Sequence, residues 1–448
     1  MENKSKIVVL GGGESGTGAA ILAKKKGFKV FLSDNKKINP KYSSVLKHFD
    51  IEFEEGAHSL NRILQADEVI KSPGIPDSIP LIKKIKEKGI PVISEIEFAK
   101  RYTKAKTICI TGSNGKTTTT LLIHHILKNA GLNIGVAGNV GKSFAWQVAT
   151  SNYDTYVLEI SSFQLDGMFD FKADIAILLN ITPDHLDRYD NDFEKYTESK
   201  LRILQNQTKN EAFIWCFDDP VLNKVLANRN IAAQQYPFSI HESEIENGAH
   251  LVNNELEIIN NKTKLTMTLE QLALQGKHNI YNSMAAGVAA KLMDIRNGTI
   301  KQCLSDFTNI PHRLEYVSSV HGITFINDSK ATNVNATWYA LENMEKPVVW
   351  IAGGIDKGND YTDIKALVKQ KVKAIVCLGT NNSRLHELFA NDVDIIIDTI
   401  SAKGAVEAAY SLAEKDEIVL LSPACASFDL FENYEDRGDQ FKEALKRL

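Results

Sequence analysis

A strand that runs directly into a glycine-rich loop and then into a helix constrains the fold of this chain more than any other segment. The strand is predicted over Thr107–Ile110, the loop reads TGSNGKT over 111–117, and the helix is predicted from Thr118 to Asn129. Glycines allow backbone N–H groups to face phosphate oxygens, and the helix N-terminus adds the positive end of its dipole. This order of elements predicts an α/β fold with an anion site at the end of a strand.

Within this loop, Lys116 supplies a cation and Thr117 supplies a hydroxyl group that suits magnesium. A full GxxxxGK[ST] pattern would place glycine at position 110, where this chain has Ile110. The alternative is a plain glycine turn that caps a helix, but the strand, the GK[ST] letters and the helix together favour a phosphate loop. The predicted phosphate-binding residues are Gly112, Ser113, Asn114, Gly115, Lys116, Thr117 and Thr118.

Short β-branched runs alternate with amphipathic helical stretches along the rest of the chain, which is typical of α/β proteins. The pattern fades around Gly89-Ile90-Pro91, and we place a linker near residues 92–96. Alternating apolar and polar residues over 250–270 predict a small antiparallel piece before an alanine-rich helix from His278 to Met293. Further strands, which predict another open parallel sheet, are expected over 323–326, 348–351, 375–378, 395–397 and 418–421.

The length of 448 residues fits about three domains at roughly 150 residues each. We predict an N-terminal Rossmann-like domain over residues 1–94 and a central P-loop ATPase-like mononucleotide-binding domain over 95–309. A C-terminal Rossmann-like domain is predicted over 310–448.

A second glycine loop near the N-terminus fits GxGxxG through Gly11, Gly13 and Gly16. Asp34 ends the next predicted strand, where a Rossmann unit places a carboxylate for ribose. The motif indicates a nucleotide diphosphate, while a purely structural glycine turn stays an alternative. The turn that starts at Ser72 follows another strand of this sheet, so it either lines the same crevice or is an ordinary turn.

Polar residues also follow strands in the predicted central domain. Glu159 and the Asp184-His185 pair come after strands, where magnesium–nucleotide sites place metal ligands. A loop histidine that only makes hydrogen bonds is the alternative for His185. Spacing alone favours a solvated side chain for Lys200. Asn282, one turn after Asn279, either holds a ligand or caps its helix.

Three polar clusters follow strands of the predicted C-terminal domain, over 327–333, 353–358 and 422–429. Parallel strands bring such clusters to one edge of the sheet, where Lys330 and Lys357 supply cations. Each cluster alone is equally well explained as structural, but three together favour a site for a small dicarboxylate.

Composition excludes several classes of protein. The net charge of −4, from 56 acidic and 52 basic residues, argues against a protein that coats nucleic acid or an anionic membrane. Five scattered cysteines argue against a secreted disulfide scaffold. The charged N-terminus passes straight into a strand with no signal-peptide core, and no apolar run approaches about 18 residues. We expect a cytoplasmic protein that neither binds nucleic acid nor inserts into a membrane.

Motifs along the whole chain resemble the Mur ligase family, the ATP-dependent amide ligases of peptidoglycan assembly. The segments that carry the resemblance are TGSNGKTT, LEISSFQL, NITPDHLDRY, ESKLRI, GKHNIYN, PHRLE, INDSKATN, GGIDKG and LSPACASFD. INDSKATN and SPACASFD are similar to the D-glutamate-adding branch. The resemblance implies that D-glutamate is joined to UDP-N-acetylmuramoyl-L-alanine through an acyl phosphate, with ADP and phosphate released. We expect a monomer.

The resemblance also assigns residues to roles. It implies ATP, two magnesium ions and a carbamylated lysine, N6-carboxylysine, at position 200. Implied metal ligands are Thr117, Glu159, His185 and Lys200, and implied catalytic residues are Lys116, His185, Lys200 and Arg313. The ATP site adds Asn282, Arg313 and Asp328 to the phosphate loop. The UDP substrate is assigned to Glu14, Ser15, Asp34, Asn35, Lys36, Ser72, Asn139 and His185. D-glutamate is assigned to Lys330, Thr332, Lys357, Ser427 and Phe428.

Three rival interpretations stay open at this point. Another ligase of the superfamily, such as a folylpolyglutamate-type enzyme, would share the phosphate loop and differ in the end domains. A nicotinamide-dependent oxidoreductase would use the N-terminal glycine loop but leave the GNGKT loop unexplained. A nucleotide-gated regulatory module would leave the predicted metal ligands without a role.

Overall fold

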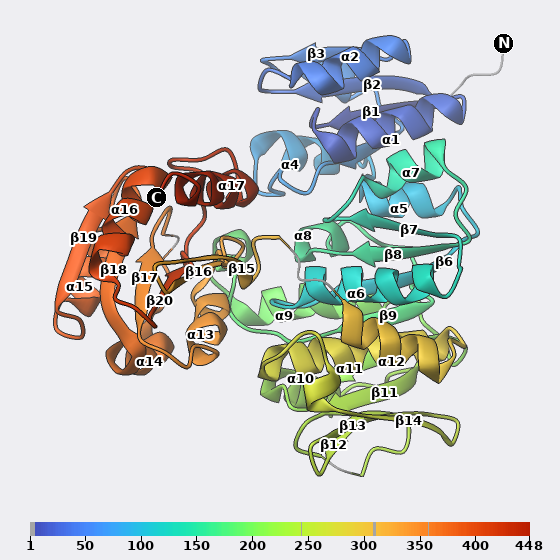
Figure 1. Ribbon diagram of the computed structural model, residues 1–448. Helices are drawn as coiled ribbons and strands as arrows, with labels where there is room; N and C mark the ends of the chain where they lie inside the picture. The colour runs from blue at the N-terminus through green and yellow to red at the C-terminus, as the bar shows by residue number, and fades with distance from the viewer. Residues whose placement is uncertain (1–4, 243, 308–310, 357) are drawn as a thin grey trace. The chain divides into compact units, whose positions relative to one another are not determined.

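The computed structural model describes residues 5–242, 244–307, 311–356 and 358–448 (Figure 1). It contains two compact units, Met1–Phe307 and Thr308–Leu448. The first unit holds a five-stranded and a nine-stranded sheet, and the second holds a six-stranded sheet. Helices flank these mainly parallel sheets, so the predicted class of three α/β domains is confirmed. Among the described residues, no helix combines the length and the apolar character needed to cross a bilayer.

The five-stranded sheet is parallel throughout, in the order β3-β2-β1-β4-β5. Its strands are β1 (Lys6–Leu10), β2 (Lys29–Asp34), β3 (Glu52–Glu55), β4 (Glu68–Lys71) and β5 (Val92–Ser94). The helices between them are α1 (Glu14–Lys25), α2 (Pro40–His48), α3 (Leu60–Ile63) and α4 (Pro80–Glu87). The central strand β1 is buried almost throughout, which explains its continuous apolar run.

The linker that we predicted near residues 92–96 is wrong. Residues 92–94 form β5, which pairs with β4, and α5 (Glu95–Lys100) begins at once. A three-residue strand and a six-residue helix are too short to show a clear hydrophobic period, so the pattern faded. Both carboxylates of α5, Glu95 and Glu97, are buried.

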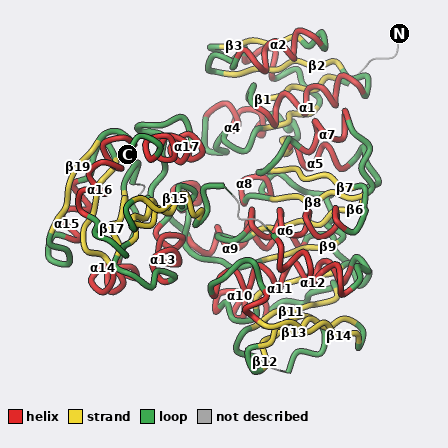
Figure 2. The backbone as a smooth tube through the Cα atoms, in the orientation of Figure 1, coloured by secondary structure: helices red, strands yellow, loops and turns green. Residues whose placement is uncertain are grey.

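The nine-stranded sheet has the order β14-β13-β12-β11-β10-β9-β6-β8-β7. Its strands are β6 (Lys106–Thr111), β7 (Ile134–Gly138), β8 (Thr155–Glu159), β9 (Ile175–Leu178), β10 (Ala212–Cys216), β11 (Gln234–Ser239), β12 (Gly248–Val252), β13 (Glu255–Asn260) and β14 (Thr263–Thr268). The antiparallel piece predicted over 250–270 is confirmed, and it extends this sheet at one edge (Figure 2).

Helices of this region are α6 (Lys116–Asn129), α7 (Phe144–Thr150), α8 (Ser162–Leu165), α9 (Phe193–Leu201), α10 (Pro220–Leu226), α11 (Lys277–Leu292) and α12 (Asn297–Asp306). Short 3-10 helices are η1 (Leu186–Tyr189), η2 (Arg202–Leu204) and η3 (Leu269–Gln271). Figure 1 shows α6, α11 and α12 packed side by side. Because β6 lies between β9 and β8, the loops that follow these three strands meet at one edge.

The six-stranded sheet has the order β15-β16-β20-β17-β18-β19. Its strands are β15 (Glu315–Val320), β16 (Ile323–Asn327), β17 (Val348–Ala352), β18 (Val372–Leu378), β19 (Ile395–Thr399) and β20 (Ile418–Leu421). Its helices are α13 (Val334–Glu342), η4 (Thr362–Ile364), α14 (Lys365–Lys371), α15 (Ser383–Phe389), α16 (Ala402–Leu412) and α17 (Tyr434–Leu445).

The five predicted strands of this sheet are present, but the sheet is not wholly parallel. Its edge strand β15, which the prediction missed, runs antiparallel to β16. Successive residues of β17 bury into opposite cores, with Val349 and Ile351 on one face and Val348 and Trp350 on the other. This burial on both faces gives the continuous apolar run by which the strand was recognised.

The five-stranded and nine-stranded sheets belong to one compact unit because α1 and α7 pack at very short range. A Cβ atom on Gly18 would lie 2.1 Å from Ser143 Oγ, so only glycine fits there. Nearby, Glu95 accepts a hydrogen bond from the Ala145 N–H, and burial raises the pKa of Glu95 to about 7.

The Glu97 carboxylate accepts three backbone hydrogen bonds, from the N–H groups of Phe169, Asp170 and Phe171, at 2.9, 3.2 and 3.0 Å. We predict that Glu97→Ala lowers the free energy of unfolding by about 3 kcal/mol, because three backbone donors, one of them fully buried, lose a charged acceptor. Urea denaturation measures this. The control is Glu87→Ala on the exposed face of α4, and an equal loss in both variants would contradict the prediction.

Candidate active site

The phosphate loop joins β6 to α6, as the sequence predicted. Gly112 has φ of 150° and Gly115 has φ of 82°, conformations that residues with a Cβ atom rarely adopt. The Lys116 ammonium donates to the carbonyl oxygens of Gly112 and Ser113, both at 2.8 Å. The Asn114 N–H donates to Asn180 Oδ1 at 2.8 Å, which ties the loop to the end of β9.

A chain of hydrogen bonds links the start of α6 to the ends of β8 and β7. Thr117 Oγ1 donates to Glu159 Oε2 at 2.6 Å, and Asn139 Nδ2 donates to Glu159 Oε1 at 2.9 Å. Thr117 and Glu159 are buried hard oxygen donors. Such donors are the ligands that magnesium prefers, so these two side chains fit that ion.

Lys200, on α9, is only 2% exposed, and its Nζ donates to the Gly112 carbonyl oxygen at 2.8 Å. Burial and the nearby charge of Lys116 hold the pKa of Lys200 well below its usual value. The expectation from spacing, a solvated lysine, is wrong, whereas the family resemblance directed attention to this residue. The low pKa favours a neutral amine, which is the form that reacts with carbon dioxide.

His185 and Asp184 lie on the loop after β9. His185 has φ of 52°, and its ring packs edge-on against Phe163 at 5.3 Å between centroids. Asp184 lies 3.7 Å from His185 Nε2 and close enough to Lys200 to oppose the lowering of its pKa. The structure thus places His185 in the region of Lys200.

Asn282 reaches the phosphate loop from α11. Its Oδ1 accepts from Thr119 Oγ1 at 3.2 Å, and a Cβ atom on Gly115 would lie 2.4 Å from that oxygen. Asn282 also donates to Asn279 Oδ1 at 3.2 Å, so the two amides share a face as predicted. Thr118 lies in the first turn of α6 and is buried.

The N-terminal glycine loop also lies between a strand and a helix. Asp34 accepts from the backbone N–H groups of Gly12 and Lys36, at 2.6 and 2.8 Å, so its carboxylate fixes this loop. Glu14, at the start of α1, accepts from the Tyr42 hydroxyl at 2.9 Å.

Other predicted uridine-site residues surround this loop. Ser72 borders it, because a Cβ atom on Gly11 would lie 2.5 Å from Ser72 Oγ. Ser15 is half-buried in α1, while Asn35 and Lys36 are exposed after β2. Arg188 donates to the Pro73 carbonyl oxygen at 3.3 Å, so the turn after β4 is connected to the loop that carries His185.

In the second unit, the polar loops follow neighbouring strands β16, β20 and β17. Asp328 is buried, and it accepts from Ser422 Oγ at 2.8 Å and from the Leu314 N–H at 3.2 Å. Burial raises the pKa of Asp328 to about 6, against the opposing charge of Arg313. Nε of Arg313 is buried and has no hydrogen-bond partner among the described residues.

The predicted D-glutamate residues lie on the same loops. Lys330 places its ammonium 5.1 Å from the centre of the Tyr434 ring, and the Thr332 N–H donates to the Lys330 carbonyl oxygen. Ser427 is buried, whereas Phe428 is 67% exposed. Lys357 lies outside the residues that the structure describes.

One further residue of this region was missed at the sequence level. Arg437, on α17, is 1% exposed, and its guanidinium donates to Ser329 Oγ, to the Ser329 carbonyl oxygen and to the Cys425 carbonyl oxygen at 2.9, 2.8 and 3.2 Å. Burial lowers its pKa to about 10. Arg437 therefore fastens the loop after β16 to the loop after β20.

Taken within the first unit, the arrangement is suited to phosphoryl transfer. It joins a glycine loop, a cation, two oxygen donors of the kind that magnesium prefers and a buried lysine at one sheet edge. Arg313 and Asp328 belong to the second unit, so their contribution to the same ATP site stays a prediction.

Three domain families match this chain in order. The Mur ligase MurD-like N-terminal domain covers residues 5–94, the Mur ligase middle domain covers 110–290, and the Mur ligase glutamate ligase domain covers 312–425. The chain is 56% identical to a UDP-N-acetylmuramoylalanine–D-glutamate ligase of Christiangramia forsetii, over 99% of both chains. It is also 56% identical to the enzyme of that name from Bacteroides fragilis, over 99% of this chain and 100% of that protein.

Solved structures share the fold at much lower identity. A pseudomurein peptide ligase type C from Methanothermus fervidus aligns with a TM-score of 0.62 and 20% identity, over 99% of this chain and 100% of that one. UDP-N-acetylmuramate-alanine ligase MurC from Thermotoga maritima aligns with a TM-score of 0.62 and 17% identity, over 99% of both chains. With three domain matches in order and full-length relatives far above chance identity, this chain belongs to the Mur ligase family.

Proposed function

We propose that this protein joins D-glutamate to UDP-N-acetylmuramoyl-L-alanine with consumption of ATP, a step of peptidoglycan precursor synthesis. The observation that carries the proposal is the 56% identity, over 99% of the chain, to ligases named for that reaction. The packing of Lys116, Thr117, Glu159 and Lys200 around one phosphate loop supports it.

The reaction has two steps. The L-alanyl carboxylate attacks the γ-phosphate of ATP, which forms an acyl phosphate and releases ADP. The amine of D-glutamate then attacks the acyl carbon, and phosphate leaves as the amide bond forms. Two anions must meet in the first step, so cations have to offset their repulsion.

The roles of the central residues follow from their positions. In this proposal the phosphates bind at the loop Gly112–Thr118, where α6 begins, and Lys116 turns from its carbonyl partners toward the γ-phosphate. Thr117 and Glu159 would hold one magnesium ion, and His185 and Lys200 would be ligands of a second. When bound, magnesium neutralises phosphate charge and orients the transferring group. Asn282, Arg313 and Asp328 complete the ATP site in this proposal.

Lys200 acts as N6-carboxylysine in this proposal. Its neutral amine takes up carbon dioxide, and one proton is released as the carbamate forms. The carbamate supplies an oxygen ligand where an ammonium group would repel the ion. The depressed pKa and the complete burial of the amine support this chemistry.

The two end regions bind the other substrates. We assign the UDP substrate to the crevice around Glu14, Ser15, Asp34, Asn35, Lys36 and Ser72, together with Asn139 and His185. Because Asp34 already accepts two backbone hydrogen bonds, its role is to shape the loop around the diphosphate. We assign the D-glutamate carboxylates to Lys330, Thr332, Lys357, Ser427 and Phe428.

The domain limits of 1–94, 95–309 and 310–448 remain our proposal, as does a monomer that works in the cytoplasm. ATP and nucleotide-linked precursors are available in that compartment, and the reaction as written needs no second subunit.

The first prediction concerns the substrate. With ATP, magnesium and UDP-N-acetylmuramoyl-L-alanine, we expect phosphate release to require D-glutamate, and L-glutamate, L-lysine and meso-diaminopimelate to be inactive. Colorimetric phosphate detection measures this. Release with another amino acid would keep the chemistry but overturn the assignment of the D-glutamate pocket.

The second prediction concerns Lys200. Lys200→Ala should lower kcat on the order of 100-fold or more, because the oxygen ligand is lost. Added formate or acetate should restore part of the rate by supplying a carboxylate in its place. Lys195→Ala is the matched control, since Lys195 is exposed on the same helix. An unchanged rate in Lys200→Ala would remove this residue from the mechanism.

The third prediction concerns Arg437 as a positioning residue. Arg437→Lys keeps the charge but cannot serve three acceptors in a planar fork. We expect kcat/KM for D-glutamate to fall on the order of 10- to 100-fold, with the KM for the UDP substrate nearly unchanged. Arg447→Lys, at the exposed end of the chain, is the control. Equal losses for both substrates would indicate general damage to the fold.

A further inference from the structure

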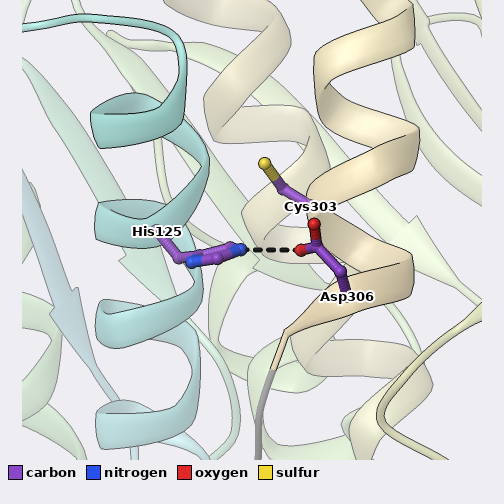
Figure 3. A group of neighbouring side chains, drawn as sticks. All are labelled: His125, Cys303 and Asp306. Carbon is purple, nitrogen blue, oxygen red and sulfur yellow. Dashed lines mark hydrogen bonds and ion pairs between the residues drawn. The ribbon is translucent and has the colours of Figure 1, made fainter.

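Three side chains with metal-binding atoms meet between α6 and α12, away from the phosphate loop. His125 projects from α6, and Cys303 and Asp306 project one turn apart from α12 (Figure 3). His125 Nε2 lies 2.9 Å from Asp306 Oδ1, and the three ligand atoms all lie within 4.8 Å of one another. The function proposed above uses none of these residues.

We propose that His125 Nε2, Cys303 Sγ and an Asp306 carboxylate oxygen bind a divalent ion of the zinc class. Imidazole, thiolate and carboxylate are the donors that zinc uses, and a soft sulfur ligand disfavours magnesium. Cys303 is buried at 2% exposure, whereas the side chains of His125 and Asp306 are 30% and 51% exposed. The ion therefore enters from the solvent side and meets the sulfur at the base of the site.

Binding requires small, identifiable changes. Two ligands at about 2.0–2.1 Å in a tetrahedral set lie roughly 3.3 Å apart, so the His125–Asp306 pair opens slightly. The Cys303 thiol gives up its proton to solvent, the neutral His125 ring carries its one proton on Nδ1, and water takes the fourth position. With the proton on Nδ1, the Asn129 amide nitrogen that faces this atom at 3.3 Å has to turn away, because both groups are donors.

The site is separate from the proposed magnesium site. His125 is nine residues beyond Lys116 on the same helix, which corresponds to roughly 13 Å at 1.5 Å per residue. An ion here clamps the phosphate-loop helix to α12, the last helix of the first unit. Its effect is on the stability of this helix pair and not on the reacting atoms.

A second trio in the other unit provides a matched comparison. Cys377, His386 and Asp398 also bring their ligand atoms within 4.8 Å. There, both carboxylate oxygens of Asp398 are already used, by Asn382 and by His386, at 2.9 Å each. Asp306 uses only Oδ1 in the hydrogen bonds of the described structure, so we place the ion at the first trio.

Cobalt titration of the chelator-treated full chain, without nucleotide, tests the proposal. We expect a thiolate-to-cobalt charge-transfer band in the near ultraviolet and visible bands of a four-coordinate ion. Cys303→Ser, His125→Gln and Asp306→Asn should each lose the charge-transfer band. His125 and Asp306 are partly exposed, so their replacements keep the fold, which circular dichroism checks.

Cys377→Ser and His386→Gln are the controls and should keep the band. Absence of the band in the unchanged protein would overturn the proposal. So would its survival in folded Cys303→Ser or His125→Gln protein, or its loss in Cys377→Ser alone, which would place the ion at the second trio.

Discussion

One backbone carbonyl oxygen positions two lysine amines at the phosphate loop. The Gly112 oxygen accepts hydrogen bonds from both Lys116 and Lys200, each at 2.8 Å. Two amines at one acceptor repel each other when both are charged, and burial penalises the charge of Lys200 further. The charges of Asp184 and Asp166 offset part of this cost, and Asp184 lies near the loop because it follows β9, the neighbour of β6. The chemistry of the site thus depends on strand order.

In the second unit, one buried guanidinium group, that of Arg437, fixes the polar loops. The loop after β16 is mainly polar, so packing alone does not fix its shape. Arg437 supplies donors to both the Ser329 and the Cys425 loops, and Asp328 accepts from Ser422 in the same region. Charged hydrogen bonds in a buried setting are directional, and they hold these loops in one geometry.

The sequence predicted the sheets and the phosphate loop because burial on both faces and glycine spacing leave strong local patterns. It missed β15, a half-exposed edge strand, and it misread 92–96 as a linker because β5 and α5 are short. Local sequence patterns could not predict the burial of Lys200 and Arg437, for one shared reason. Each is a charged residue within a polar helix, and only the tertiary fold buries it. The family resemblance identified Lys200, whereas Arg437 was identified only from the structure.

The close approach of Gly18 to Ser143 has a consequence for how this architecture changes over evolution. The contact between α1 and α7 leaves no room for a side chain at position 18. α1 therefore cannot pack equally well against an unrelated surface. Recombination between relatives at residues 94 and 95 would leave α1 facing a foreign α7, although Glu95 would stay with its partner Ala145. Exchange of the five-stranded sheet and its helices therefore requires that α5 and α7 be inherited with it, so the inherited block is larger than the sheet itself.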